Sequence, residues 1–279
     1  MRHLKLIPDD TKIPFVKWRN IAVSLSVVVV IASAVLLFTR GLNFGIDFTG
    51  GILIEISTDG PADIAELRND LGGLGLGEIQ IQEFGQADDV LIRVQAPDSD
   101  DEAASQQVVN MIRAELGDRV VEYRRVEVVG PQVSGELVQD GILAVVIAVV
   151  LMLIYIWFRF EWQFALGSIV SLIHDVMATI GIFCILQLEF NLASIAALLT
   201  IVGYSMNDTV IVYDRIRENL RKFKKMDLGD LLDLSINQTL SRTVMTSGTT
   251  LLALAALFIF GGAVLRDFTF AMIFGIFVG

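Results

Sequence analysis

Three charged residues lie inside or at the edge of long apolar segments, where a charge is expensive. Asp175 lies near the middle of one segment, Asp208 in the last third of the next, and Arg242 at the start of the one after. A charged side chain at bilayer depth costs roughly 2.5–3.5 kcal/mol or more, so such residues are rare and usually serve an ion or proton pathway. These three residues are therefore the first candidates for chemistry.

The spacing of polar residues predicts a polar helical face around each charge. Residues three, four, seven or eight positions apart share a face of an α-helix. By this rule Arg242 groups with Thr246, Thr249 and Thr250, Asp208 with Tyr204 and Ser205, and Asp175 with Ser168, Ser171 and Thr179. Polar faces in a membrane must meet each other or water rather than lipid. We therefore expect the three faces to turn together and Asp208 to pair with Arg242.

Such a pair could relay protons. Beside Arg242 the Asp208 carboxylate stays ionised, whereas separation of the helices desolvates it and favours protonation. Proton exchange would then be coupled to helix motion, with a driving force of about 2.3 kcal/mol per proton per 100 mV. The alternative is a static ion pair that fixes helix packing. Asp175 and His174 form either a second relay element or an interhelical hydrogen-bonding site, and the residues alone leave both choices open.

Several other kinds of chemistry are not indicated. The sequence has no GxxxxGK[ST] loop, and the glycine-rich run at 72–77 is not GxGxxG and follows a predicted helix. One cysteine, Cys184, and two histidines supply neither a nucleophilic set nor a metal site. A net charge of −11 without a basic stripe argues against nucleic acid. We expect no enzymatic activity, no cofactor and no metal.

Long apolar runs dominate the composition, with 54% hydrophobic residues and a mean hydropathy of +0.64. A span needs roughly 20 apolar residues. After a tail at 1–20, which carries no cleavage signal, spans are predicted at 21–39, 135–158, 164–188, 191–214 and 242–261, with an incomplete sixth at 267–279. The predicted fold class is a polytopic α-helical membrane protein.

A polar segment at 40–134 separates the first two predicted spans. Alternation and turn residues predict strands at 51–58, 78–84, 90–95 and 120–129, helices at 61–71 and 100–116, and a hairpin loop at 85–89. The order strand, helix, strand, strand, helix, strand matches a split βαβ, ferredoxin-like domain. A domain of about 90 residues can build a modest core on one sheet face.

Lysine and arginine predict the orientation, because they favour the cytoplasmic side. The polar segment has no lysine, seven arginines and eighteen acidic residues, whereas the segment at 215–241 is rich in basic residues. Other basic residues fall on the same predicted side as 215–241, namely Arg2, Lys5, Lys12, Lys17, Arg19 and Arg159. We therefore expect cytoplasmic termini and a periplasmic segment at 40–134. Its acidity indicates a solvated surface, with partner docking as the alternative.

Four motifs resemble those of the SecD/SecF family of protein-export subunits. They are FGIDFTGG at 44–51, VGPQVSGEL at 129–137, VGYSMNDTVIVYDRIREN at 202–219 and QTLSRTVMTSGTT at 238–250. The GYSxND pattern, in which the acid follows Asn207, is similar to SecF rather than to SecD. The motifs run in order from residue 40 to the end of the chain, and the first forty residues add only topology.

The resemblance implies a multi-pass protein of the bacterial inner membrane. Its membrane part would be related to the RND transporters, as a six-helix half bundle with the last helix incomplete and the ferredoxin-like domain inserted. SecF-like proteins pair with SecD, associate with the SecYEG channel, and use the proton-motive force to move unfolded exported polypeptides. YajC, YidC and membrane lipids are further expected partners. The family's Asp–Arg pair maps by motif onto Asp208 and Arg242, which favours the relay.

Two further sets of residues complete the expected site. Supporting polar roles are expected for Ser205, Asn207, Thr246, Thr249 and His174. The segment Gly41–Gly51 is expected to form a strand and turn that links the first predicted span to the polar segment. Its glycines are expected to act as a hinge rather than as binding residues, and the motif members are Gly45, Asp47, Gly50 and Gly51.

Two competing functions remain at this level. The chain could be half of an RND-type exporter of a small molecule or lipid, or an assembly subunit that transports nothing. An exporter needs an apolar cavity in its outward domain, whereas the segment at 40–134 is small, acidic and free of lysine.

Overall fold

The structure, a computed structural model, describes residues 8, 11–77, 79–84, 86–95, 102–262 and 265–279. It divides into two compact units, one of residues 1–43 and 145–279 and one of residues 44–144. The predicted basic residues Arg2 and Lys5, and the predicted element starts at 78 and 100, lie outside the described residues.

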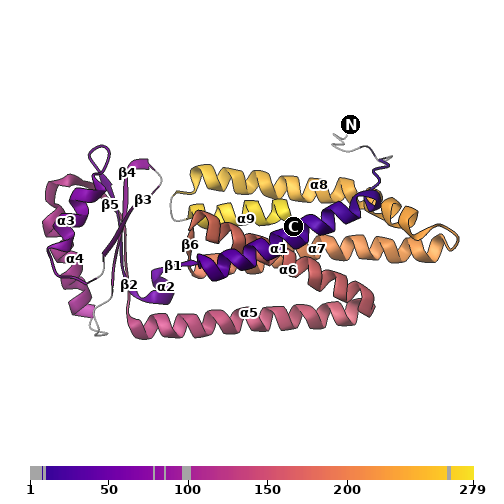
Figure 1. The fold of residues 1–279 in the computed structure, drawn as a ribbon, viewed down its shortest axis with the longest axis horizontal. Helices are drawn as coiled ribbons and strands as arrows, with labels where there is room; N and C mark the ends of the chain where they lie inside the picture. Colours follow the sequence, from indigo (N-terminus) through magenta and orange to yellow (C-terminus); the bar gives the residue numbers. More distant parts are fainter. Residues whose placement is uncertain (1–7, 9–10, 78, 85, 96–101, 263–264) are drawn as a thin grey trace. The chain divides into compact units, whose positions relative to one another are not determined.

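Long apolar helices make up the first unit (Figure 1). Its elements are η1 (Val16–Trp18), α1 (Arg19–Thr39), α6 (Trp162–Leu186), β6 (Glu189–Phe190), α7 (Leu192–Lys222), α8 (Leu228–Phe260) and α9 (Arg266–Val278), with β1 (Asn43–Phe44) and α5 (Pro131–Arg159) crossing the division. Within the described residues, five helices are long and apolar enough to cross a membrane. The chain is therefore a multi-pass membrane protein. Helix α9 has 13 residues.

Two of these helices run well past the predicted spans. Residues 215–241 were expected to be a loop, but α7 continues to Lys222 and α8 already begins at Leu228. The 31 residues of α7 extend about 46 Å, which exceeds the roughly 30 Å of hydrocarbon. Arg, Lys and Glu have high helix propensity but low hydropathy. A prediction based on hydropathy therefore finds the apolar part of a helix and misses its polar extension. Asp227 caps α8 by accepting from the Gly229 backbone N–H at 2.9 Å.

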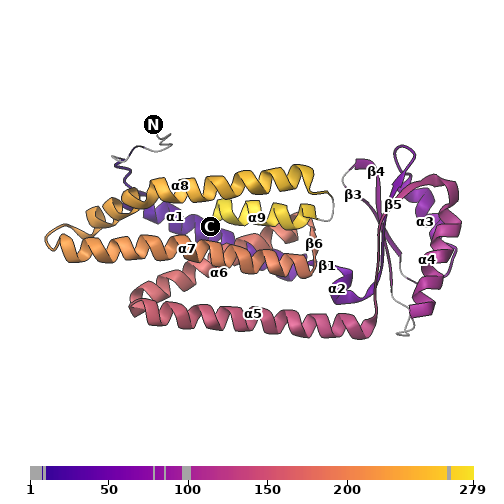
Figure 2. The same cartoon turned by 180° about the vertical axis from the view of Figure 1, so that it is seen from behind.

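The helices of the first unit pack closely. Helices α7, α8 and α9 lie side by side in both views (Figures 1 and 2), and α6 packs against α1 and α7. Phe183, Ile201 and Met272 are at most 5% exposed and form the centre of one apolar cluster. At the crossing of α1 and α6, a Cβ on Gly181 would lie 2.2 Å from Ser33 Oγ. Only glycine allows this approach.

Buried amides join the polar ends of α7 and α8. Asn219, 2% exposed, donates from Nδ2 to Ser235 Oγ and to Gln238 Oε1, each at 2.9 Å. Buried side-chain amides in folded proteins are nearly always hydrogen-bonded. The extensions of α7 and α8 therefore form a specific helical pair rather than a loose loop.

The second unit is an antiparallel sheet with two helices on one face (Figure 1). Its strands lie in the order β3-β4-β2-β5. The elements are α2 (Ile46–Thr49), β2 (Gly51–Thr58), α3 (Ile64–Gly72), β3 (Ile79–Phe84), β4 (Gln86–Val94), α4 (Glu102–Leu116), η2 (Gly117–Arg119) and β5 (Val120–Val129). The predicted strands at 51–58 and 120–129 are confirmed residue for residue, and the other predicted strands and helices are confirmed to within a few residues.

The predicted hairpin loop at 85–89 is wrong. Strand β4 already begins at Gln86, and Gly85 lies outside the described residues. The polar residues Asp88 and Asp89 suggested a turn, but Asp89 pairs with Ser57 of β2 and accepts from Arg124 Nη1 at 2.6 Å. A neighbouring arginine thus accommodates a carboxylate that would otherwise disfavour the strand.

Alternate residues of the central strand β2 form the core of this unit. Ile52, Ile54 and Ile56 are fully buried on one face, against Leu71 of α3 and Ile112 of α4. Residues two apart share a sheet face, so the alternating residues of β2 point to the opposite side. Helices α3 and α4 therefore cover this face, whereas Leu53 and Leu91 on the opposite face pack against Ile46 of α2.

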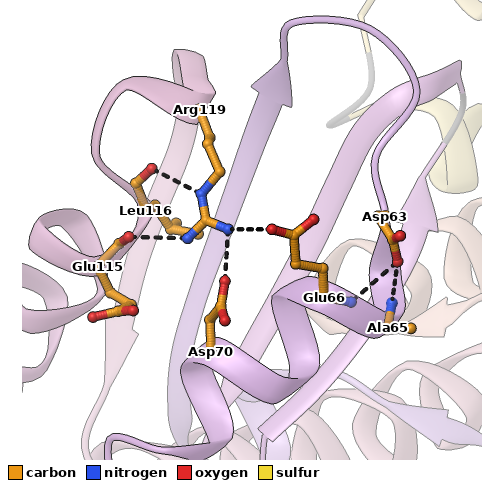
Figure 3. A network of polar contacts seen from close by, with 7 residues as sticks. All are labelled: Asp63, Ala65, Glu66, Asp70, Glu115, Leu116 and Arg119. Atoms are coloured by element: carbon orange, nitrogen blue, oxygen red, sulfur yellow. Dashed lines mark hydrogen bonds and ion pairs between the residues drawn. The ribbon is translucent and has the colours of Figure 1, made fainter.

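An arginine ties the two helices of the unit together (Figure 3). Arg119 Nη1 donates to Asp70 Oδ2 at 2.6 Å and lies 3.5 Å from Glu66 Oε1, while its other nitrogens donate to carbonyls at the end of α4. At the start of α3, Asp63 accepts from two backbone N–H groups. These contacts fix the start of β5 against α3.

The opposite sheet face buries a carboxylate. Glu55 is 2% exposed, and its Oε1 has no hydrogen-bond partner in the described part of the chain. Burial raises the pKa of Glu55 above its usual value, although Arg124 and Arg125 oppose this. The folded state thus binds the proton more readily than the unfolded state. Stability is lost as pH rises from the ordinary glutamate pKa through the raised folded value.

We expect Glu55→Gln to stabilise this unit at pH 7 by about 1 kcal/mol, because a buried unpaired charge is removed. The gain should vanish below the ordinary glutamate pKa, where Glu55 is protonated in both states. Hydrogen exchange at the β2 amides of the full chain, compared between variants at matched pH, measures this. The exposed Glu122→Gln is the control and should change little. A loss of protection at pH 7 would show instead that the carboxylate is favourably paired.

Candidate functional site

Asp208 borders a partly open cavity between three helices. The cavity has a volume of about 280 Å³ and is lined from α7, α8 and α9. Its polar lining consists of Tyr204, Ser205, Asp208, Thr243 and Ser247, and its apolar lining includes Ile201, Leu251 and Ile276. The predicted grouping of Asp208 with Tyr204 and Ser205 is confirmed, because all three border this space.

The Asp208 carboxylate is only partly satisfied. Its Oδ1 atom is buried and has no hydrogen-bond partner among the described residues. A buried acceptor without a donor costs about 1–3 kcal/mol. Binding a proton, or a water in the adjacent cavity, would remove that cost. The site is therefore suited to a group that changes its protonation state.

The expected ion pair between Asp208 and Arg242 is not formed. No nitrogen of Arg242 lies within 4.0 Å of an Asp208 oxygen, although the structure describes both residues. Arg242 is exposed, and the face of α8 that lines the cavity carries Thr243 and Ser247 instead. Each residue turns an α-helix by about 100°, so the cavity meets α8 one residue away from the predicted face.

Asp175 lies in a buried interhelical site. It is 2% exposed, and its Oδ2 accepts from Ser205 Oγ of α7 at 2.5 Å, while His174 Nδ1 lies 3.0 Å from Oδ1. Ser168 and Thr179 share this buried face of α6, as the spacing predicted. Ser205 also lines the Asp208 cavity, so a single side chain contacts Asp175 and borders the space beside Asp208.

The remaining predicted polar residues lie outside the cavity. Thr246 and Thr249 donate to carbonyls of their own helix, and Asn207 is exposed. Conversely, sequence reasoning missed Thr243 and Ser247, although Tyr204 Oη donates to Ser247 Oγ at 3.4 Å. Thr243 and Ser247 are four positions apart, so the sequence did indicate that they share a helical face. The predicted polar face of this helix was instead centred on Arg242, which left both residues out.

Neither carboxylate is part of a metal site. Among the residues that the structure describes, no group of three or more His, Cys, Asp or Glu side chains could hold a metal ion. Two carboxylates, the Ser205 hydroxyl and a partly open cavity therefore define the candidate site.

Comparison with known proteins relates this arrangement to a family. A family model described as "Protein export membrane protein SecD/SecF, C-terminal" matches residues 108–279, and one described as "SecD/SecF GG Motif" matches residues 35–62. Protein translocase subunit SecF from Cereibacter sphaeroides is 47% identical over 99% of this chain and 87% of its own. The chain belongs to the SecF family.

Other comparisons extend the likeness to SecF. Protein translocase subunit SecF from Vibrio alginolyticus is 43% identical over 99% of this chain and 87% of its own. The crystal structure of SecDF, a translocon-associated membrane protein from Thermus thermophilus, matches 98% of this chain with a TM-score of 0.87 and 36% identity. The chain spans 37% of that SecDF chain. SecDF in a super-membrane-facing form matches 96% with a TM-score of 0.67.

In the segment that the SecD/SecF GG Motif model covers, the expected strand is present as β1, but a short helix replaces the expected turn. Residues Ile46–Thr49, including Asp47, form the short helix α2. Gly45 has a φ of −73°, which any residue adopts, so the expected need for glycine there is wrong. Gly50 and Gly51 have φ values of 68° and 136°, which favour glycine. A Cβ on Gly50 would also lie 3.4 Å from Ser134 Oγ.

Proposed function

We propose that this chain acts as the SecF subunit of a SecDF-type complex and uses the proton-motive force to assist protein translocation through SecYEG. One observation carries the proposal: among the described residues, Asp208 has a buried, unpartnered oxygen beside a partly open cavity between three helices. A carboxylate in that setting gains by binding a proton when water is excluded, and loses it when the cavity hydrates. Helix motion that opens or closes the cavity would then move a proton.

The proposed relay has three members. Asp208 is the primary carrier, and Asp175 exchanges with it through Ser205, which touches both environments. Arg242 is exposed on this chain, and an arginine at bilayer depth must be covered by protein or reach water. We infer that a partner subunit covers Arg242 and that its position sets the charge near Asp208.

The proposed topology has both termini in the cytoplasm and residues 40–134 in the periplasm. The basic extension of α7 and the acidic, lysine-free second unit support it through the positive-inside tendency. Helix α9 is proposed as the first part of the sixth span of an RND-like half bundle. The strand order β3-β4-β2-β5 supports the ferredoxin-like assignment of the second unit. In this order α3 joins β2 to β3 across β4, and α4 joins β4 to β5 across β2.

The proposed partners follow from the relatives. In the Thermus thermophilus SecDF structure, the matching region is 37% of a longer chain, which supports SecD as the complement of this chain. SecYEG, unfolded exported polypeptide, and YajC and YidC complete the proposed assembly in the bacterial inner membrane. No nucleic acid, cofactor or catalytic chemistry is part of the proposal.

Two other functions would use the same fold. An RND-type exporter of small molecules or lipids would need SecYEG-independent transport, and an assembly subunit would need no proton flux. Co-purification with SecYEG distinguishes the first from the proposal. Proton flux through reconstituted SecD and SecF distinguishes the second.

The direct test is translocation into inverted membrane vesicles lacking the native SecD and SecF. We expect restoring SecD together with this chain to raise proton-motive-force-dependent translocation several-fold, and to have no such effect when an uncoupler is added. Vesicles with SecD alone are the control. Equal stimulation with and without the uncoupler would support the assembly role and contradict proton coupling.

A further inference from the structure

A second hollow lies where the start of α1 meets the start of α8. It has a volume of about 500 Å³ and none of its lining residues borders the Asp208 cavity. Lys17, Arg19 and Asn20 line one side, and Leu228 and Leu232 line the other. The hollow therefore combines two cations and an amide with an apolar wall.

The cationic side is held in place by buried polar contacts. The Ile13 backbone N–H donates to Asn237 Oδ1 at 3.0 Å, and Asn237 Nδ2 donates back to the Ile13 carbonyl at 2.9 Å. The Val16 backbone N–H donates to Asp233 Oδ1 at 2.8 Å. These contacts fix the residues just before Lys17 against α8. The two cations are thus presented from an ordered segment rather than from a free tail.

The charges of the hollow favour an anion. Lys17 and Arg19 form no ion pair with any residue that the structure describes. The one carboxylate that lines the hollow, Asp227, accepts from the Gly229 N–H as the cap of α8. A helix N-terminus carries a partial positive charge that offsets such a cap. A ligand in the hollow therefore meets two free cations.

The surroundings place the hollow at a membrane surface. The apolar helix α1 starts at Arg19, beside the hollow. The lining residue Leu228 is 59% exposed, and Trp18, between the lining residues Lys17 and Arg19 in the chain, is 57% exposed. Tryptophan concentrates at the level of lipid headgroups, and basic side chains at helix ends reach for that same level. Phosphate groups are the anions found there.

We propose that this hollow binds the headgroup of an anionic glycerophospholipid. Lys17 and Arg19 contact the phosphate oxygens, Asn20 donates to the headgroup, and Leu228 and Leu232 line the first part of an acyl chain. The bound lipid joins the start of α1 to the start of α8, the helix that carries Thr243 and Ser247. The inference rests on the proposed function only in requiring that α1 spans a bilayer.

Native mass spectrometry of the purified full chain with added phosphatidylglycerol tests this. We expect the double variant Lys17→Gln/Arg19→Gln to lower the phosphatidylglycerol adducts about tenfold relative to the unmodified chain. The matched control is Lys224→Gln/Lys225→Gln, which removes the same charge from exposed side chains that do not line the hollow and should change adducts less than about twofold. The charge-preserving swap Lys17→Arg/Arg19→Lys should retain binding and shows that the segment still folds.

Three results would overturn the proposal. Equal losses in the two Gln variants would mean diffuse attraction to anionic lipid. Unchanged adducts in the Lys17→Gln/Arg19→Gln chain would mean that lipid binds elsewhere. Displacement by millimolar inorganic phosphate would assign the hollow to free phosphate. The measurement is independent of proton flux, since Asp208→Asn should leave these adducts unchanged, so failure of this inference and failure of the proposed function are distinguishable.

Discussion

Asp208→Asn is expected to abolish proton-coupled translocation while the chain still inserts and assembles. Asparagine has nearly the same shape but cannot exchange a proton, so the buried site beside the cavity loses the carrier. A loss of at least about 100-fold is expected, which corresponds to about 2.7 kcal/mol in the barrier. Proton flux and translocation in vesicles containing SecD measure it, and the amount of membrane-inserted chain is measured alongside.

The matched control is Asp214→Asn on the same helix. Asp214 pairs with Arg159 at the end of the apolar part of α7, and its side chain is 40% exposed. Removing an exposed, ion-paired carboxylate changes little, because such pairs contribute at most about 1 kcal/mol. Transport should therefore stay within about fivefold of the unmodified chain. Full proton flux in Asp208→Asn would reject the relay, and an equal loss in both variants would show that the assay reports general damage.

Periodicity predicted the second unit well because its strands are regular. In β2 the isoleucines at 52, 54 and 56 alternate with residues on the other face, and this period fixes both the strand and its buried side. The start of β4 was mispredicted because its stability comes from Arg124, a residue 35 positions away from Asp89. A local pattern cannot contain such a contact.

The candidate site was predicted in its residues but not in its geometry. Depth in an apolar segment identified Asp175 and Asp208, since a charge there is costly whatever its partner. The face of α8 that meets Asp208 depends on helix rotation, and rotation is set by packing along the whole helix. A one-residue difference therefore replaced Arg242 by Thr243 at the cavity. The Ser205 contact to Asp175 likewise required the relative heights of α6 and α7.

Asp175→Asn is the second substitution expected to have a large effect on transport. Its result distinguishes a role of Asp175 in the relay from a fixed hydrogen bond. As a relay member, Asp175 must ionise, so Asp175→Asn should lower proton-driven translocation about tenfold or more. As a packing group, it need only accept from Ser205, which an asparagine oxygen also does. Transport close to normal in Asp175→Asn would therefore assign Asp175 to packing. Proton flux in the same vesicles gives the readout.

Ser205→Ala makes this test independent of the carboxylate itself. It removes the hydroxyl that joins Asp175 to the Asp208 cavity and leaves a buried carboxylate oxygen without its donor, at a cost of about 1–3 kcal/mol. The control is Ser168→Ala, which removes a buried hydroxyl from the same face of α6. This hydroxyl donates to the Phe164 carbonyl, lies against Tyr213 of α7, and does not line the Asp208 cavity. If Ser205 carries the proton between the carboxylates, Ser205→Ala and Asp175→Asn lower the flux together, and the double variant is no worse than the stronger single one. Additive losses would mean that the two side chains act separately, and the relay would then consist of Asp208 without Asp175.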